Sequence, residues 1–205
     1  VKSARADIYA DVRDLSYKPD SIDEIRSHHL LEHFSRQEAL MLLAMWHRWL
    51  KPGGLLIIET PDFEESAKKF FDSNIESQFL LTRHIFGSEE AGWAYHRDFW
   101  SERKFRYVLS RLGYGYFRFE KFSNNLGKKA PILGKIKLPL ENKLLKELGK
   151  IGFNNLPNIV CYAKKAVLEI DYRKAIADIL SKSLVGRESK SNILAIWMAD
   201  IKGKI

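Results

Sequence analysis

The sequence predicts an α/β fold built on a partial doubly wound sheet, and three observations carry that prediction. Leu55–Ile58 is a continuous apolar run of strand length, which is typical of strands covered on both faces. A helix with a complete start signal precedes this run, and a further strand precedes that helix. Strand, helix and strand in this order form one βαβ unit with a right-handed crossover.

Five segments with strand patterning are expected to form the sheet. They are Ile8–Val12, Ile22–Ser27, Leu55–Glu59, Tyr116–Phe122 and Asn158–Ala163. The apolar character of Leu55–Glu59 places that strand in the interior of the sheet, with neighbours on both sides.

The helix between the second and third strands begins at Ser35. Glu38 follows three residues later, so the Ser oxygen and the Glu carboxylate each satisfy an unpaired backbone N–H in a capping box. The segment Lys51-Pro52-Gly53-Gly54 ends this helix in a tight turn. Proline presets the first central residue of such a turn, and we expect Gly53 to take a positive φ.

Helical patterning resumes beyond the third strand. It runs from Phe63 to Phe86, and a loop from Gly87 to Trp100 follows. Ser101 is the expected cap of a further helix, which Gly113 ends.

The chain divides near residue 165. Residues 1–165 are expected to form one domain with a lysine-rich insertion at about 123–157, and residues 166–205 a C-terminal helical extension of two amphipathic helices. Residues 121–205 hold 17 Lys and Arg against 7 Asp and Glu. These lysines are spread out with few aromatic residues between them, which favours a solvated face over a nucleic-acid-binding module.

The cysteine content and the length of the apolar runs indicate in which cellular compartment the protein works. The single cysteine, Cys161, excludes an internal disulfide framework and suits the reducing cytoplasm. We expect neither a signal peptide nor a membrane-spanning segment, since the apolar runs are a few residues long.

Three segments, taken together with their order and spacing, resemble the class I S-adenosylmethionine-dependent methyltransferases. They are Ala10–Leu15, Asp23–His33 and Leu50–Glu59. The later stretch His96–Ser101, followed by a helix that ends at Leu112-Gly113-Tyr114, is similar to the same family. The resemblance implies a Rossmann-like methyltransferase sheet and S-adenosyl-L-methionine as the cofactor.

The resemblance also implies cofactor-binding residues at two strand ends. In that family the carboxylate at the Asp11 position accepts a hydrogen bond from the adenine amino group, and the next N–H, here Val12, donates to the adenine ring. The residues that follow the next strand, here His28 and His29, lie near the methionine part of the cofactor. Ligands of open α/β sheets bind beyond the carboxyl ends of strands. An ordinary capping aspartate is the alternative for Asp11.

The family's first strand, its glycine-rich loop and its ribose-binding acidic residue are expected upstream of Ala4, so the chain resembles the C-terminal two-thirds of the domain. Gly113-Tyr114-Gly115 is the G-x-G of the chain, but it ends a helix and therefore does not replace that loop. We expect the chain alone to bind S-adenosylmethionine weakly. We also expect it to self-associate through the exposed edge at Ile22–Ser27, or to be poorly soluble.

His29-Leu30-Leu31-Glu32-His33 also matches the H-x-x-E-H pattern of a class of zinc proteases. Zinc binding in that pattern requires both histidines on one helical face. Because Ser35 begins the helix, residues 29–33 precede it, and we expect no metal site of this kind.

Two histidines are candidates for catalysis. His96 lies on a loop that members of the family place over the substrate pocket, and His33 follows the second strand. Histidine is suited to deprotonate a hydroxyl group before methyl transfer. We expect His33 and His96 as catalytic residues and Tyr95 and Arg97 as substrate-binding residues; a histidine without a catalytic role is the alternative for each of the first two.

The function that follows from the resemblance is methyl transfer to a small molecule or a glycan. The alternative is a non-catalytic, methyltransferase-like interaction module that packs on another domain, since the two amphipathic tail helices need a surface to cover.

Overall fold

The computed structural model describes residues 7–124, 156–185 and 190–201. The helices and strands in these ranges are β1 (Ile22–His28), α1 (Arg36–Trp49), β2 (Leu50–Pro61), α2 (Phe63–Phe71), α3 (Ile75–Phe86), α4 (Glu102–Arg111), β3 (Tyr114–Asn124), β4 (Leu156–Lys165), α6 (Tyr172–Ser181) and α7 (Lys190–Ala199). Two short 3-10 turns, η1 (Val12–Asp14) and η2 (Leu31–His33), flank β1. The expected insertion lies almost entirely outside the described residues.

The sheet has the strand order β1-β2-β4-β3. β1 and β2 run parallel, whereas β4 is antiparallel to both β2 and β3. The expected α/β fold is therefore confirmed, and so is the interior position of β2. β1 is an edge strand among the described residues, as the sequence predicted.

The glycine segment after α1 forms an irregularity within β2. Ile22 pairs with Leu50, but Glu24 already pairs with Leu55, so β2 accommodates extra residues at this point. Gly53 takes a φ of +77°, which confirms the predicted positive angle. The Pro-Gly-Gly segment thus ends the helix as expected, although it does so inside the strand and not as a separate turn.

α1 begins with the predicted capping box. Ser35 Oγ accepts from the Glu38 N–H at 3.3 Å, and the Glu38 carboxylate accepts from the Ser35 N–H at 2.9 Å. The apolar face of the helix then packs into the core, where Trp46 and Trp49 are buried.

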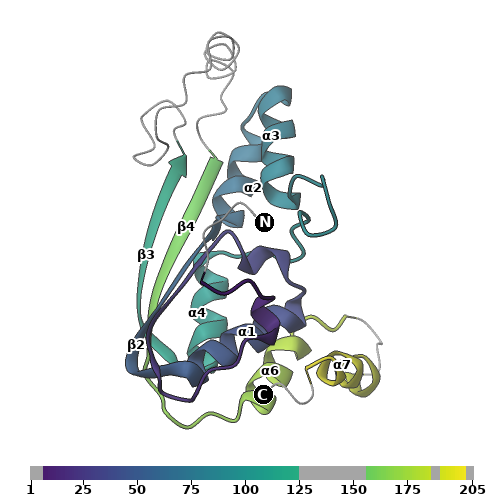
Figure 1. Ribbon diagram of the computed structural model, residues 1–205. Coiled ribbons are helices and arrows are strands. Elements are labelled where there is room, and N and C mark those ends of the chain that lie inside the picture. The colour runs from purple at the N-terminus through teal and green to yellow at the C-terminus, as the bar shows by residue number, and fades with distance from the viewer. Residues whose placement is uncertain (1–6, 125–155, 186–189, 202–205) are drawn as a thin grey trace.

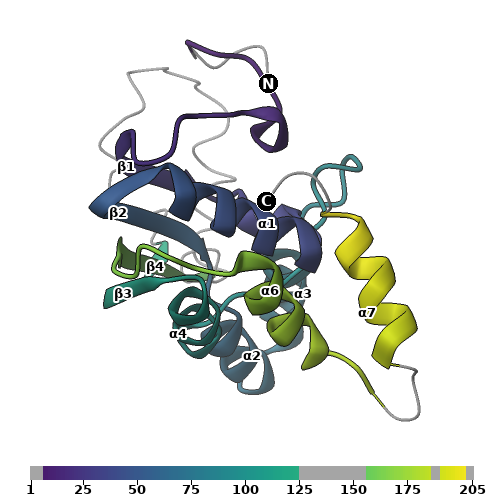
Figure 2. The ribbon, with the colours of Figure 1, turned by 90° about the horizontal axis from the view of Figure 1, so that it is seen from below.

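The core lies between the sheet and helices α1, α4 and α6, which share one side of the sheet in both views (Figures 1 and 2). Leu56 and Ile58 of β2 and Ile159 and Cys161 of β4 face these helices and are buried. Ile176 of α6 belongs to the same cluster of buried residues and is fully buried. None of the described helices is long and apolar enough to cross a membrane.

The opposite side of the sheet carries charged side chains. Arg118 of β3 lies over the ring of Tyr162 of β4, 3.8 Å from its centroid. Tyr162 donates to Glu120, and Arg118 is paired with the same carboxylate. Arg118, Glu120 and Tyr162 thus form one network of polar contacts on this face of the sheet.

The predicted strand at Ile8–Val12 is wrong. This segment pairs with no described strand, and Ile8 and Tyr9 are exposed. The Asp11 side chain instead accepts from the Arg13 N–H at 2.9 Å and begins η1. An aspartate that bonds its own neighbouring backbone favours a turn, and a single strand without a partner leaves its backbone groups unpaired.

The helical pattern from Phe63 to Phe86 is divided into two helices. Asp62 accepts from the Glu65 N–H and caps α2, and Asn74 accepts from the Ser77 N–H and caps α3. α3 then ends at Gly87, which has a φ of +93°.

Candidate active site at the carboxyl ends of β1 and β2

Parallel strands β1 and β2 end side by side, and charged side chains meet at that edge. His28 Nδ1 lies 3.0 Å from one carboxylate oxygen of Glu59, and His29 Nε2 lies 3.3 Å from the other. The backbone N–H of His29 donates to the Glu59 carbonyl at 2.9 Å. His29 has a φ of +44°, so the chain turns sharply as it leaves β1. Glu59 therefore holds both histidines of the strand end.

The turn η2 buries the next carboxylate. Glu32 is 2% exposed, and neither of its carboxylate oxygens accepts a hydrogen bond from a described residue. His29 Nδ1 lies 3.2 Å from Oε1, outside hydrogen-bond geometry. The carboxylate raises the pKa of His29, because it favours the protonated imidazole more than burial opposes it.

The loop from Gly87 to Trp100 is fixed against this turn by its backbone. Gly87 and Tyr95 form an isolated bridge, and the His96 N–H donates to the Phe86 carbonyl at 2.9 Å. The N–H of Arg97 donates to the Glu32 carbonyl at 2.8 Å. His96 is thereby placed beside a turn that lies more than sixty residues earlier in the chain.

The rings of His33 and His96 meet edge to face, with centroids 4.8 Å apart. Nδ1 of His33 lies 3.1 Å from the Tyr95 carbonyl oxygen, and Nδ1 of His96 lies 3.2 Å from that of Ile85. A carbonyl oxygen only accepts, so each Nδ1 carries the proton and each Nε2 presents a lone pair. Burial lowers the pKa of His96, which keeps this ring neutral near pH 7.

A cleft of about 320 Å³ opens beside these two histidines. Its other lining residues come mainly from α3 and the loop, and they include Arg83, His84 and Trp93. His84 Nε2 donates to the Pro157 carbonyl at 2.7 Å, and burial lowers the pKa of its imidazole. Five of the six histidines of the chain, all except His47, thus gather at this end of the sheet.

The cleft contains residues to which sequence reasoning gave no role. His84 and Arg83 stand together at the end of a helix, where a solvated helix end was the simpler interpretation. Of the expected substrate-binding residues, Tyr95 contributes its carbonyl to His33, and Arg97 lies 3.7 Å from Glu38. Neither side chain is among those that line the cleft, and their roles stay predictions.

Asp11 and Val12 lie at the start of η1. Arg13 holds the Asp11 carboxylate at 2.6 Å and also donates to Glu38, whose other oxygen faces Arg97. Both oxygens of the Asp11 carboxylate already accept from Arg13, so an adenine amino group would share this acceptor with the guanidinium. The structure therefore fits the cofactor in part: His28 and His29 stand at the strand end where the resemblance requires them, while Asp11 is engaged elsewhere.

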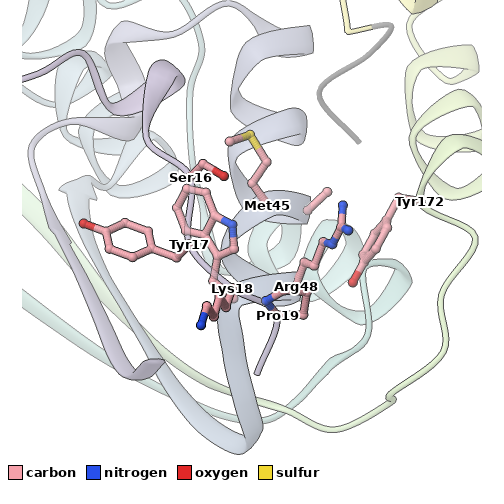
Figure 3. Close-up of a pocket in the computed structure, with 9 residues that line it drawn as sticks. Ser16, Tyr17, Lys18, Pro19, Met45, Arg48 and Tyr172 are labelled. Carbon is pink, nitrogen blue, oxygen red and sulfur yellow. The ribbon is translucent and has the colours of Figure 1, made fainter. Parts of the chain in front are cut away.

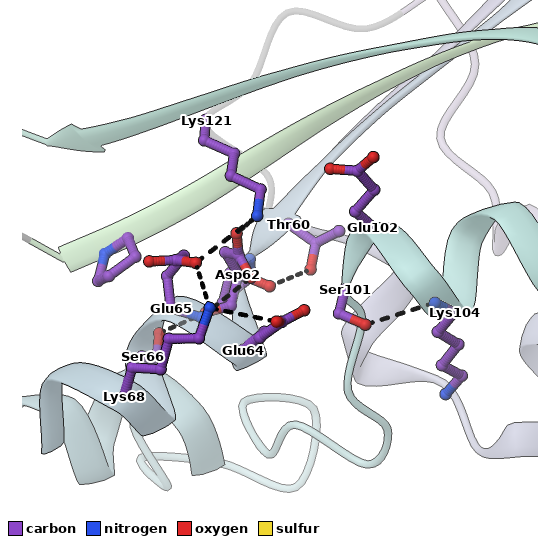
Figure 4. Close-up of polar contacts among 12 residues, drawn as sticks. Thr60, Asp62, Glu64, Glu65, Ser66, Lys68, Ser101, Glu102, Lys104 and Lys121 are labelled. Carbon is purple, nitrogen blue, oxygen red and sulfur yellow. Dashed lines mark hydrogen bonds and ion pairs between the residues drawn. The ribbon is translucent and has the colours of Figure 1, made fainter. Parts of the chain in front are cut away.

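A polar network at the end of β2 fixes the helices that carry the cleft (Figure 4). Asp62 is fully buried and caps α2, and Lys121 of β3 lies 3.5 Å from its second oxygen. Lys68 bridges Glu64 and Glu65 at 3.2 and 3.0 Å. The Lys68 pairs lie within α2, whereas Lys121 joins the start of this helix to the sheet, and α3 follows from α2.

A second cleft, of about 430 Å³, lies at the opposite ends of the strands (Figure 3). It is lined by Tyr17, Arg48 and Tyr172 among others, and Tyr17 packs edge to face on Trp49 at 5.1 Å. Ligands of open α/β sheets bind at carboxyl ends, so the smaller cleft is the candidate site.

Comparison with known proteins identifies one family that this chain resembles. Residues 2–58 match the family described as "Methyltransferase domain". A search of curated proteins finds no significant match.

Among solved structures, an Archaeoglobus fulgidus SAM-dependent methyltransferase is 16% identical with a TM-score of 0.46; the match covers 77% of this chain and 66% of that one. A Methanosarcina mazei SAM-dependent methyltransferase is also 16% identical, with a TM-score of 0.44. This match covers 77% of this chain and 66% of that one. A third structure is a Haemonchus contortus phosphoethanolamine N-methyltransferase in complex with phosphomonomethylethanolamine and S-adenosylhomocysteine. It is 16% identical with a TM-score of 0.41, and the match covers 76% of this chain and 36% of that one.

The chain thus spans no more than two-thirds of the length of these structures, with TM-scores below 0.5. The family match rests on the segment that contains η1, β1, α1 and most of β2, including the strand end at His28 and His29. Through this segment the chain is similar to the methyltransferase domain family, and its α/β sheet is compatible with the class I S-adenosylmethionine-dependent type.

Proposed function

We propose that this chain supplies the acceptor-binding part of an S-adenosylmethionine-dependent methyltransferase that acts on a small molecule or a glycan. The observation that carries the proposal is the cluster of histidines with the buried Glu32 and the half-buried Glu59 around the cleft at the carboxyl ends of β1 and β2. This is the end of the sheet at which the family match ends.

The family's cofactor supplies an electrophilic methyl group when it is bound. His28 and His29 are the residues that we propose to lie beside it, and Glu59 fixes both of their rings. Asp11 and Val12 would take the adenine contacts, with Arg13 still bound to the Asp11 carboxylate. The described residues hold part of the cofactor surface, and weak cofactor binding by the chain is the expected consequence.

His96 is the proposed general base for the acceptor. Its Nδ1–H donates to Ile85, its Nε2 lone pair is available, and burial lowers its pKa, so the neutral form that accepts a proton is present at pH 7. His33 has the same arrangement with Tyr95 and is the second candidate. An acceptor hydroxyl in the cleft would donate its proton to one of these nitrogens as its oxygen attacks.

The cleft also indicates the class of acceptor. Trp93 offers an exposed aromatic face to the cleft, and such a face suits a sugar ring or a flat apolar group. Arg83 adds a cation that suits an acidic or phosphorylated acceptor. A small hydroxylated molecule fits both features.

The test is release of S-adenosylhomocysteine by the full chain, with labelled cofactor and a panel of hydroxylated small molecules that includes monosaccharides and sugar phosphates. Replacement of the base, His96→Ala, is expected to lower kcat by about 100-fold or more. Cofactor binding, measured separately by calorimetry, should stay the same in that variant. If the chain forms no product and binds no cofactor even at millimolar concentration, the non-catalytic interaction module is the better description.

A further inference from the structure

Glu32 is a buried carboxylate without a hydrogen bond, and the proposed methyl transfer gives it no role. It is 2% exposed, and both of its oxygens lack a hydrogen-bond donor among the described residues. A buried ionised carboxylate is costly unless a cation or a set of donors compensates it. The nearest charged partner, His29, approaches Oε1 to 3.2 Å without forming a hydrogen bond. A cation at this position would satisfy the carboxylate.

His33 and His96 stand beside this carboxylate in the orientation that metal-binding histidines take. Each donates one ring N–H to a backbone carbonyl, at 3.1 Å for His33 and 3.2 Å for His96. Such a bond fixes the tautomer and the ring, and it leaves the other nitrogen as a lone-pair donor. Two imidazoles so held form an ordered ligand set with the buried Glu32 carboxylate, whose oxygens accept no hydrogen bond from a described residue.

The distances agree with this interpretation. One ligand atom from each of Glu32, His33 and His96 lies within 4.8 Å of the other two. A zinc ion about 2.0–2.1 Å from each ligand holds tetrahedral ligands about 3.4 Å apart, so small side-chain rotations close the site. The backbone bond from Arg97 to the Glu32 carbonyl, at 2.8 Å, already fixes the two segments that carry the ligands.

We propose that Glu32, His33 and His96 bind one divalent transition-metal ion, with an open coordination position toward the cleft. Two nitrogen ligands favour zinc and its first-row neighbours over magnesium, which prefers oxygen ligands. Three protein ligands leave at least one position for water or for an acceptor oxygen. The site differs from the H-x-x-E-H pattern that the sequence suggested, because His96 from the loop takes the place of His29.

This inference does not depend on methyl transfer. The bound ion uses the same nitrogen lone pairs that would otherwise accept a proton. In the ion-loaded chain, an acceptor hydroxyl is therefore activated by coordination, which lowers its pKa, and its proton leaves to solvent. Metal binding is measured without cofactor or acceptor, so its failure leaves the proposed function standing.

The experiment titrates the full chain, freed of metal with a chelator, with Zn²⁺ against a chromophoric indicator. One ion per chain is expected, and His33→Ala, His96→Ala and Glu32→Gln should each weaken binding by about tenfold or more. The matched control is His84→Ala, which removes an imidazole of the same cleft that donates to Pro157. Circular dichroism checks that each variant is folded.

A second measurement uses the unchanged chain. Zn²⁺ should protect His33 and His96 from carbethoxylation by diethyl pyrocarbonate, read peptide by peptide in a mass spectrometer, while the exposed His28 stays reactive. Absence of stoichiometric Zn²⁺ binding would overturn the assignment. Equal loss of binding in His84→Ala and in the ligand variants would overturn it too, as would unprotected His33 and His96 at saturating Zn²⁺.

Discussion

Two glycines with positive φ provide a matched test of how the loop that carries His96 is held. Gly87 has a φ of +93° and a ψ of 177°, a region that is open essentially to glycine alone. A Cβ added there would lie 2.0 Å from the Ala94 carbonyl oxygen and 2.9 Å from the His96 nitrogen. Gly53 has a φ of +77°, and an added Cβ would meet nothing within 4 Å.

The magnitudes follow from these surroundings. Gly53→Ala should lower the free energy of unfolding by about 1–2 kcal/mol, the cost of a left-handed backbone at a residue with a side chain. Gly87→Ala carries a larger backbone strain, up to about 3 kcal/mol, and the clash with a backbone carbonyl adds about 1–3 kcal/mol. We therefore expect the second substitution to cost roughly 2 kcal/mol more than the first.

Urea unfolding followed by tryptophan fluorescence measures both values, and an unchanged m-value shows that the two-state description holds in each variant. Gly87→Ala should also weaken Zn²⁺ binding, since it displaces the segment from Ala94 to His96, whereas Gly53→Ala should not. Equal costs for the two variants, or a cost below about 1 kcal/mol for Gly87→Ala, would refute the reasoning.

Three further predictions concern stability and association. Ser35→Ala removes one half of the capping box at the start of α1 and should lower the free energy of unfolding in urea by about 1 kcal/mol. An unchanged free energy of unfolding would contradict this role of Ser35. Burial lowers the pKa of His47 to about 4, below its unfolded value of about 6.5, so stability should fall as pH drops from about 6.5 to about 4, by up to about 3 kcal/mol. His47→Gln should flatten that acid slope, and an unchanged slope would contradict the assignment. The exposed edge of β1 should cause concentration-dependent association in light scattering; a clean monomer at high concentration would show that the edge is protected.

Local signals in the sequence predicted local structure well. Ser35 and Glu38 stand at the spacing of a capping box. Gly53 directly follows Pro52, the order typical of a tight turn with a positive φ at the glycine. Each signal depends on residues a few positions apart, so tertiary contacts need not be known. The apolar run Leu55–Ile58 located the interior strand for the same reason.

The features that the sequence did not predict depend on distant partners. Ile8–Val12 has strand patterning, but a strand also needs a neighbour, and the carboxylate of Asp11 bonds locally instead. His33 and His96 were recognised separately, yet their edge-to-face contact depends on backbone bonds between the loop and η2. The burial of Glu32 beneath that loop has no sequence signal of its own, because Glu is ordinarily an exposed residue.

We propose that the carboxyl ends of β1 and β2 are the cofactor-binding end of the sheet. Histidine side-chain NMR spectra of the metal-free chain, recorded as S-adenosylmethionine is added, test it most directly, because five histidines lie at that end and His47 lies elsewhere in the core. The ring signals of His28 and His29 should shift with cofactor concentration while those of His47 stay in place. Ring signals of His28 and His29 that do not move at millimolar cofactor, or a shift at His47 as large as theirs, would contradict it.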